Sequence, residues 1–197
     1  MRLWTIQNEQ VWQELQKKGA LLTRKKWVDP HFLRGYEWMR KQMISRIGPP
    51  KQDLQFPIWA WYQATNAPRK RPDLRESGYF PPGTTGYRIE IEKASKEVLL
   101  SDFELWHSPL SHRYFIGASQ TEAEEFNAHL REVYGTHAFE QLPPDIQQKI
   151  ERSWEKIFDL GFDVAYFARP LQEKQIQATF WELNMYEVVE VDQFRAR

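Results

Sequence analysis

Phe56-Pro57-Ile58-Trp59-Ala60-Trp61-Tyr62 is the stretch of this sequence that best indicates the fold. Its aromatic and β-branched residues favour a strand, and both faces of that strand would carry apolar side chains. A strand of this kind is covered on both sides, so we place it centrally in a sheet. Because side chains alternate along a strand, we expect Trp59 and Trp61 on one face and Ile58, Ala60 and Tyr62 on the other.

Strands and helices follow one another irregularly on either side of this stretch. Strands are expected at 3–6, 87–91, 98–100, 176–183 and 187–191, and helices after Asn8, after Asp29-Pro30, from Thr121, and from Pro143-Pro144-Asp145. Because the two kinds of element do not alternate regularly, a doubly wound parallel fold is disfavoured. The sequence predicts one α+β domain over residues 1–197, with a mixed or mainly antiparallel sheet and flanking helices.

Composition narrows the classes of function. Lys plus Arg equals Asp plus Glu at 27 each, so net charge does not indicate nucleic-acid binding, which would need a local basic patch. There is no cysteine, no Walker A motif and no Gly-x-Gly-x-x-Gly after a strand, and the five histidines show no clear metal-ligand spacing, so no metal site is expected. The start lacks a secretory signal and no apolar run could cross a bilayer, so we expect a soluble, cytoplasmic protein without a membrane partner.

The unusual feature of the composition is its aromatic content, which is 15% of the residues and includes nine Trp. Large rings bury much area per residue, so one interpretation is a core rich in aromatic side chains. The other is a surface on which a base, a nicotinamide or a sugar stacks. Both interpretations apply to Trp59 and Trp61.

Residues 63–86 are rich in Pro, Arg, Gly and Ser and form the longest expected loop. Long loops inside compact domains are often functional or disordered. Arg69, Lys70 and Arg71 form a compact basic cluster directly after the aromatic strand, which suggests phosphate binding at the border of a ligand cleft. The alternative is a solvated loop tip.

Glu182 is the strongest candidate for catalysis. In the expected strand over 176–183 it shares a face with Ile176, Ala178 and Phe180, which are apolar. A carboxylate on a buried face must be paired, protonated or placed at the mouth of a cleft. The functional interpretation predicts a pocket lined by the first strand and by Trp59 or Trp61, whereas the structural ones are a solvent-exposed strand end or an ion pair with an arginine.

Several Trp-containing segments together resemble the bacterial family called domain of unknown function 3841. They are Leu3-Trp4-Thr5-Ile6-Gln7, the helix with Tyr36, Trp38-Met39, Gln42-Met43 and Arg46, Pro57-Ile58-Trp59-Ala60-Trp61, Leu100-Ser101-Asp102-Phe103 with Trp106-His107, and Trp181-Glu182. The resemblance extends over nearly the whole chain. It implies one intact domain and leaves the chemistry open.

At the level of the fold, the chain also resembles small ADP-ribosyltransferases that modify DNA or accept RNA phosphates. Those proteins begin with a strand, a short helix and a Gly-Leu turn, as residues 3–21 are expected to, and carry a catalytic Glu on a late strand, as Glu182 would be. Their first strand holds NAD through a His or Arg, where this sequence has Thr5 and Gln7. Either side chain would still hydrogen-bond an amide.

Two classes of function follow. In an NAD- or nucleotide-using transferase, Glu182 would orient a ribose hydroxyl, Trp59 or Trp61 would stack on a ring, and Arg46 or the basic loop would hold phosphate. In a binding module, the same aromatic cleft and loop would hold a nucleotide or single-stranded nucleic acid without chemistry. A purely structural or regulatory protein is the third interpretation.

Overall fold

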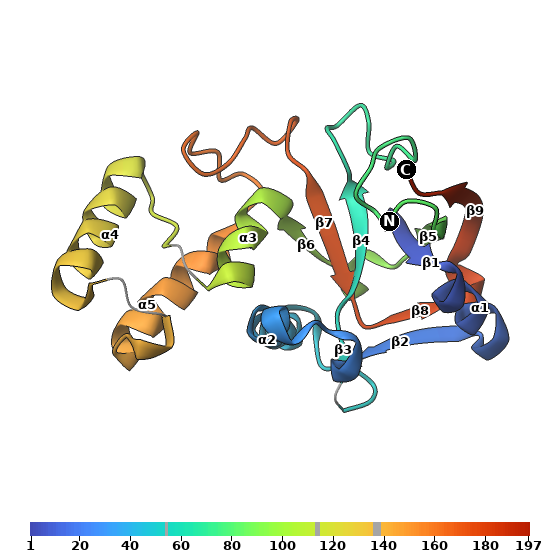
Figure 1. Ribbon diagram of the computed structural model, residues 1–197, viewed down its shortest axis with the longest axis horizontal. Helices are drawn as coiled ribbons and strands as arrows, with labels where there is room; N and C mark the ends of the chain where they lie inside the picture. Colours follow the sequence, from blue (N-terminus) through green and yellow to red (C-terminus); the bar gives the residue numbers. More distant parts are fainter. Residues whose placement is uncertain (54, 113–114, 136–138) are drawn as a thin grey trace.

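Residues 58–62 of the aromatic stretch lie in an inner strand of a six-stranded sheet (Figure 1). The computed structural model describes residues 1–53, 55–112, 115–135 and 139–197. All the strand pairs within this sheet are antiparallel, and β4 lies inside the sheet as predicted. In spatial order the strands are β6 (Leu99–Asp102), β7 (Ile176–Phe180), β4 (Ile58–Gln63), β1 (Arg2–Asn8), β5 (Thr85–Glu92) and β9 (Val188–Arg195).

A second, smaller sheet packs against the first. It contains β3 (Gln55–Phe56), β2 (Ala20–Arg24) and β8 (Glu182–Asn184), again with antiparallel pairs. The chain passes from the small sheet to the large one at Pro57 and returns at Trp181, whose indole Nε1 donates a hydrogen bond to the Gly48 carbonyl at 2.9 Å. The expected single strand over 176–183 is therefore wrong, because Trp181 divides it between two sheets.

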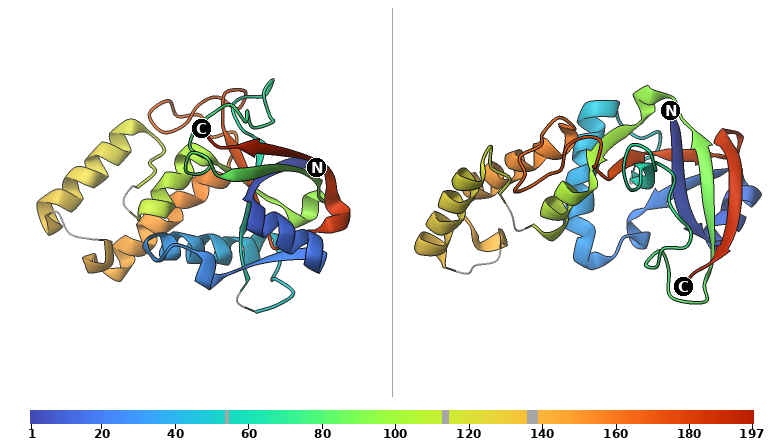
Figure 2. Two further views of the ribbon diagram at one scale, coloured as in Figure 1. Left: turned by 45° about the vertical axis from the view of Figure 1, so that its right-hand side comes forward. Right: turned by 90° about the horizontal axis from the view of Figure 1, so that it is seen from above.

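Five α-helices complete the α+β fold of the described chain. They are α1 (Glu9–Lys18), α2 (Leu33–Ile47), α3 (Phe103–Ser111), α4 (Gln120–Tyr134) and α5 (Pro144–Ser153). Figures 1 and 2 show α1 and α2 beside the sheets, whereas α4 lies at the end of the molecule farthest from β9.

Local capping signals explain where the helices begin. Asn8 accepts a hydrogen bond from the Val11 amide at 2.9 Å, and Gly19 ends the same helix with a φ of 73°. Asp102 caps α3, a helix that the sequence analysis did not predict. The helix expected from Thr121 is capped two positions earlier, because the Ser119 side chain accepts a hydrogen bond from the Glu122 amide and α4 begins at Gln120.

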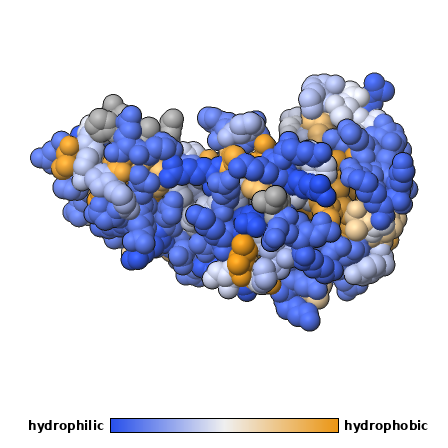
Figure 3. All heavy atoms as spheres, turned by 90° about the horizontal axis from the view of Figure 1, so that it is seen from below, coloured by the Kyte–Doolittle hydropathy of each residue, from blue (hydrophilic) through white to orange (hydrophobic). Residues whose placement is uncertain are grey.

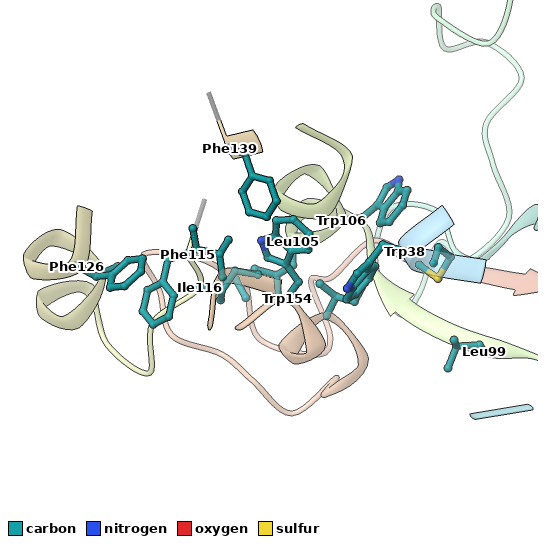
Figure 4. Packing of buried hydrophobic residues seen from close by; sticks show 14 of the residues in the cluster. Trp38, Leu99, Leu105, Trp106, Phe115, Ile116, Phe126, Phe139 and Trp154 are labelled. Atoms are coloured by element: carbon teal, nitrogen blue, oxygen red, sulfur yellow. The ribbon is translucent and has the colours of Figure 1, made fainter. Parts of the chain in front are cut away.

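The large sheet separates two hydrophobic cores. One core lies between the two sheets and α1, and includes Leu3, Ile58 and Ala60. The other joins the sheet to the helices, and Figure 4 shows it as a row of side chains from Leu99 in β6, past Trp38 and Trp154, to Phe126 in α4. The abundant aromatic residues thus serve the second core above all.

The predicted alternation along β4 is confirmed. Ile58 and Ala60 belong to the core between the sheets, and Tyr62 packs against it. Trp59 packs against the helical core on the opposite face, and the Trp61 ring contacts Phe103 of α3 with centroids 5.0 Å apart. A register shift after Trp61 does not change this arrangement.

Candidate functional site

A basic hollow of about 240 Å³ lies over the outer face of the small sheet. Outer and inner faces follow from strand alternation, since Leu21 is buried between the sheets whereas Leu22 and Arg24 point outward. The hollow lies between β2, the last two turns of α1 and the segment after β2. Its lining residues are Glu14, Lys18, Ala20, Leu22, Arg24, Lys26, Trp27 and Gln52.

Trp27 is the most distinctive side chain of the basic hollow. It ends the short 3₁₀ helix η1 (Lys25–Trp27), and 49% of its surface is exposed. The Lys26 ammonium lies 5.3 Å from the centre of the Trp27 ring. A half-exposed indole beside a cation offers a flat apolar surface on which a planar ring can stack.

Cationic groups outnumber anionic ones in the basic hollow. Lys18 is paired with Glu14 at 2.5 Å, four residues earlier in α1. Arg24 and Lys26, in contrast, have no ion pair with any described residue. These two cations remain available to an anionic ligand.

Glu182 lies on the same outer face as the basic hollow. It pairs across the ladder with Leu22, a lining residue, and directly opposed side chains of an antiparallel pair share one face. Its carboxylate accepts a hydrogen bond from the Lys51 ammonium at 2.8 Å, which raises the pKa of Lys51 above its ordinary value. The Glu182 side chain is 21% exposed and Lys51 is 81% exposed, so solvent reaches this pair.

This position differs from the one expected from the sequence. Glu182 does not share a face with Ile176, Ala178 and Phe180, because the chain has already changed sheets at Trp181. Its partner is Lys51, whereas Arg46 pairs with Glu155 at 3.2 Å. The structural alternatives of an open strand end and an ion pair describe its surroundings better than a buried carboxylate does.

Trp59 and Trp61 are covered by other aromatic side chains. The Trp59 ring lies 4.9 Å from Trp106 and 5.6 Å from Tyr36, and its buried Nε1 has no hydrogen-bond partner among the described residues. Burial among these rings also raises the pKa of Tyr36. Neither indole lines the basic hollow.

Thr5 and Gln7 form hydrogen bonds with the protein itself. The Thr5 hydroxyl donates to the Trp59 carbonyl at 2.9 Å and accepts from Gln7 Nε2 at 2.7 Å. Thr5 is fully buried. These contacts tie β1 to β4, and the pair lies in a different sheet from Glu182.

The three basic residues after β4 point to different partners. Arg71 pairs with Asp192 and, at 3.6 Å, with Glu190, both in β9. The Lys70 ammonium lies 4.7 Å from the centre of the Tyr62 ring, and Arg69 is exposed. The structure therefore does not bring the three charges together around one phosphate-sized space.

The sequence analysis missed the residues of the basic hollow. Their signal is the run Arg24-Lys25-Lys26-Trp27, in which three cations precede a tryptophan. Lys18 joins them only because β2 folds back along α1. The described part of the chain, which does not include His137, contains no group of three or more side chains that could hold a metal ion. None of the described helices is long and apolar enough to cross a membrane.

Comparison with known proteins supplies the family. The family model for domain of unknown function 3841 matches residues 2–189. The chain belongs to this family. The match includes the small sheet, α1 to α5, every residue that lines the basic hollow, and the large sheet except for most of β9. No curated protein and no solved structure matches the chain, and its expected fold-level resemblance to small ADP-ribosyltransferases is not confirmed.

Proposed function

We propose that this DUF3841 chain binds a ligand with phosphate groups and a planar ring, as in a nucleotide or single-stranded nucleic acid, in the basic hollow. The observation that carries the proposal is the half-exposed Trp27 beside two cations, Arg24 and Lys26, that lack ion pairs among the described residues. The indole would stack on a base, and the two cations would contact phosphate.

The electrostatics of the whole chain agree with a local site. Its formal net charge is zero, so attraction of an anion depends on where the charges lie. On the side of α2 and β2, Figure 3 shows a largely hydrophilic surface with small, separate hydrophobic patches. A surface of this kind suits a polar, charged ligand better than a large apolar one.

The test is a binding titration with three probes: ADP, a short fluorescently labelled oligothymidine, and inorganic pyrophosphate. A base-stacking site binds ADP or the oligonucleotide more tightly than pyrophosphate. The variant Arg24→Gln/Lys26→Gln removes both cations, and we expect it to weaken binding by about tenfold or more.

The matched control is Arg69→Gln/Lys70→Gln, which removes the same charge from the loop after β4. We expect it to bind as the wild type does. Equal losses in the two double variants would mean that only net charge matters, and no binding of any probe by the wild type would refute the proposal.

A transferase that uses NAD or another nucleotide is the second candidate. The observation that favours it is the position of Glu182 on the same sheet face as the basic hollow, directly across from Leu22. Incubation with labelled NAD and nucleic acid or protein acceptors tests it. The transferase is supported if the wild type transfers label and Glu182→Gln does not, at unchanged stability and unchanged ligand affinity. If the wild type transfers no label, the transferase is refuted and only the binding function remains.

A further inference from the structure

A second hollow, of about 380 Å³ and acidic, lies where β5, η3 (Ser95–Glu97) and the start of β9 meet. It is lined by Glu92, Ala94, Glu97, Tyr186, Glu187 and Val189. Three of these six side chains are carboxylates and no lining residue is basic, so its charge is opposite to that of the basic hollow.

Exposed apolar side chains gather at the acidic hollow. Tyr186 is 84% exposed and Val189 53%, and the neighbouring Met185 is 37% exposed. Tyr186 has the largest exposed fraction among the large hydrophobic residues in the described ranges. An exposed tyrosine ring in a hollow lined by carboxylates is typical of a contact surface, because covering the ring with a partner is favourable in free energy.

The carboxylates of the acidic hollow differ in what they already bind. Glu187 is buried, pairs with Lys93 at 2.7 Å and accepts from the Asn184 amide at 2.8 Å, so its role is structural. Glu97 is half-exposed and forms a longer ion pair, at 3.6 Å, with the same Lys93 ammonium. Glu92 is exposed and has no ion pair with any described residue.

Arg2 lies opposite Glu92 in the β1–β5 ladder, yet it does not neutralise this carboxylate. The Arg2 guanidinium pairs with Glu90 at 3.0 Å, and Glu90 also accepts from the Trp4 indole. Glu92 therefore leaves the rim of the hollow with negative charge that no ion pair among the described residues compensates, and Glu97 shares the single Lys93 ammonium with Glu187.

We propose that the acidic hollow is a docking site for a basic peptide segment of a partner protein. An arginine or lysine of that segment lies over the Tyr186 ring, between Glu92 and Glu97. Charge complementarity identifies the occupant, since an exposed aromatic ring and two exposed carboxylates that line one hollow attract a cation through both the ring face and the charges. The proposal does not depend on ligand binding in the basic hollow.

The acidic hollow lies near the Glu182–Lys51 pair, because Lys93, the partner of Glu187, also donates a hydrogen bond to the Glu182 carbonyl. The pKa of Lys51 is raised first by its hydrogen bond with Glu182 and, to a smaller extent, by the charge of Glu97 at the acidic hollow, and the next residue, Gln52, lines the basic hollow.

The test measures fluorescence anisotropy of a labelled oligoarginine peptide, with oligoglutamate of equal length as the negative probe. We expect the wild type to bind oligoarginine only. Tyr186→Ala should weaken binding by about threefold, and Glu92→Gln/Glu97→Gln by about tenfold. All three residues are exposed, so both variants should keep the circular dichroism spectrum and unfolding midpoint of the wild type.

The matched control is Glu125→Gln/Glu132→Gln, which removes two exposed carboxylates from α4. Unchanged affinity in this control supports the site. An equal loss in the control, or full affinity in Tyr186→Ala, would overturn it. Self-association of the wild type that both acidic-hollow variants abolish, with no peptide binding, would also overturn it by making a second copy the occupant.

Discussion

The buried ion pair between Asp102 and Lys174 provides the sharpest test of how the fold is held together. Both side chains are 1% exposed, and the ammonium lies 2.5 Å from Asp102 Oδ2. Lys174 also donates to the Phe162 carbonyl at 2.8 Å. The other oxygen of Asp102 accepts from the amides of Glu104 and Leu105, at 2.9 and 3.2 Å, and so caps α3.

Asp102→Asn separates these two roles. Asparagine is as good an N-cap as aspartate, so the start of α3 is retained, whereas the buried ammonium of Lys174 loses its counter-ion. Removing one partner of a buried pair costs about 3–5 kcal/mol. We therefore expect Asp102→Asn to lower the free energy of unfolding by about 3 kcal/mol or more, and Asp102→Ala by about 1 kcal/mol more through loss of the cap.

The assay is urea unfolding at neutral pH, followed by circular dichroism and Trp fluorescence. The double variant Asp102→Asn/Lys174→Met also removes the buried cation and should recover most of the loss, because an apolar residue of similar volume often replaces a buried ion at little cost. A loss below about 1 kcal/mol in Asp102→Asn, or additive losses in the double variant, would refute this account of the pair.

Three further predictions test the helical part of the fold and one expected site residue. Gly35→Ala places a Cβ 2.9 Å from the Pro109 carbonyl oxygen, so it should cost about 1–3 kcal/mol in urea unfolding, and wild-type stability would contradict the close approach of α2 to α3. Burial beside Phe139 and Trp154, together with the charge of Arg34, lowers the pKa of His112 below 6.5, while the charge of Glu140 opposes this shift. As the pH falls below about 6.5, the unfolded chain therefore takes up the proton more readily than the folded chain does, and the free energy of unfolding should decrease. His112→Phe should flatten this pH dependence in urea unfolding. Arg46→Ala breaks a solvent-exposed pair with Glu155 and a contact with the Phe158 ring, so we expect a loss of about 1 kcal/mol or less and unchanged ADP binding; a lower affinity would return Arg46 to the site.

Much of the fold follows from local sequence signals. Asn8 and Gly19 bound α1 as their residue types predict, and the period of β4 places Trp59 and Ile58 on opposite faces. These features depend on neighbouring residues, so a single sequence contains enough information to predict them.

The errors occur where a distant contact decides the structure. Trp181 looks like one more apolar residue in a strand, yet its indole donates to the carbonyl of Gly48, far away in the chain, at the point where the chain changes sheets. In the same way, α3 carries Pro109 in its interior, yet the cap at Asp102 and its packing against Gly35 support a helix. Such contacts override local preference.

The candidate site was harder to predict than the fold. Glu182 was predicted from the sequence to share a face with Ile176, Ala178 and Phe180, whereas it lies in the small sheet. The basic run at Arg69 was predicted to bind phosphate because it follows the aromatic strand, although the structure pairs Arg71 with Asp192 of β9. The run that ends at Trp27 becomes notable only when β2 brings it beside α1.

The central claim is that Trp27 and its neighbouring cations bind a phosphate-bearing ring. The most direct measurement is the affinity of Trp27→Ala for ADP and labelled oligothymidine, with Tyr166→Ala as the control because Tyr166 is exposed to a similar degree, 53% against 49%. Stacking contributes about 1–3 kcal/mol per base, so Trp27→Ala should raise the dissociation constant by roughly 5- to 150-fold, and Tyr166→Ala should leave it unchanged. Wild-type affinity in Trp27→Ala would contradict the account.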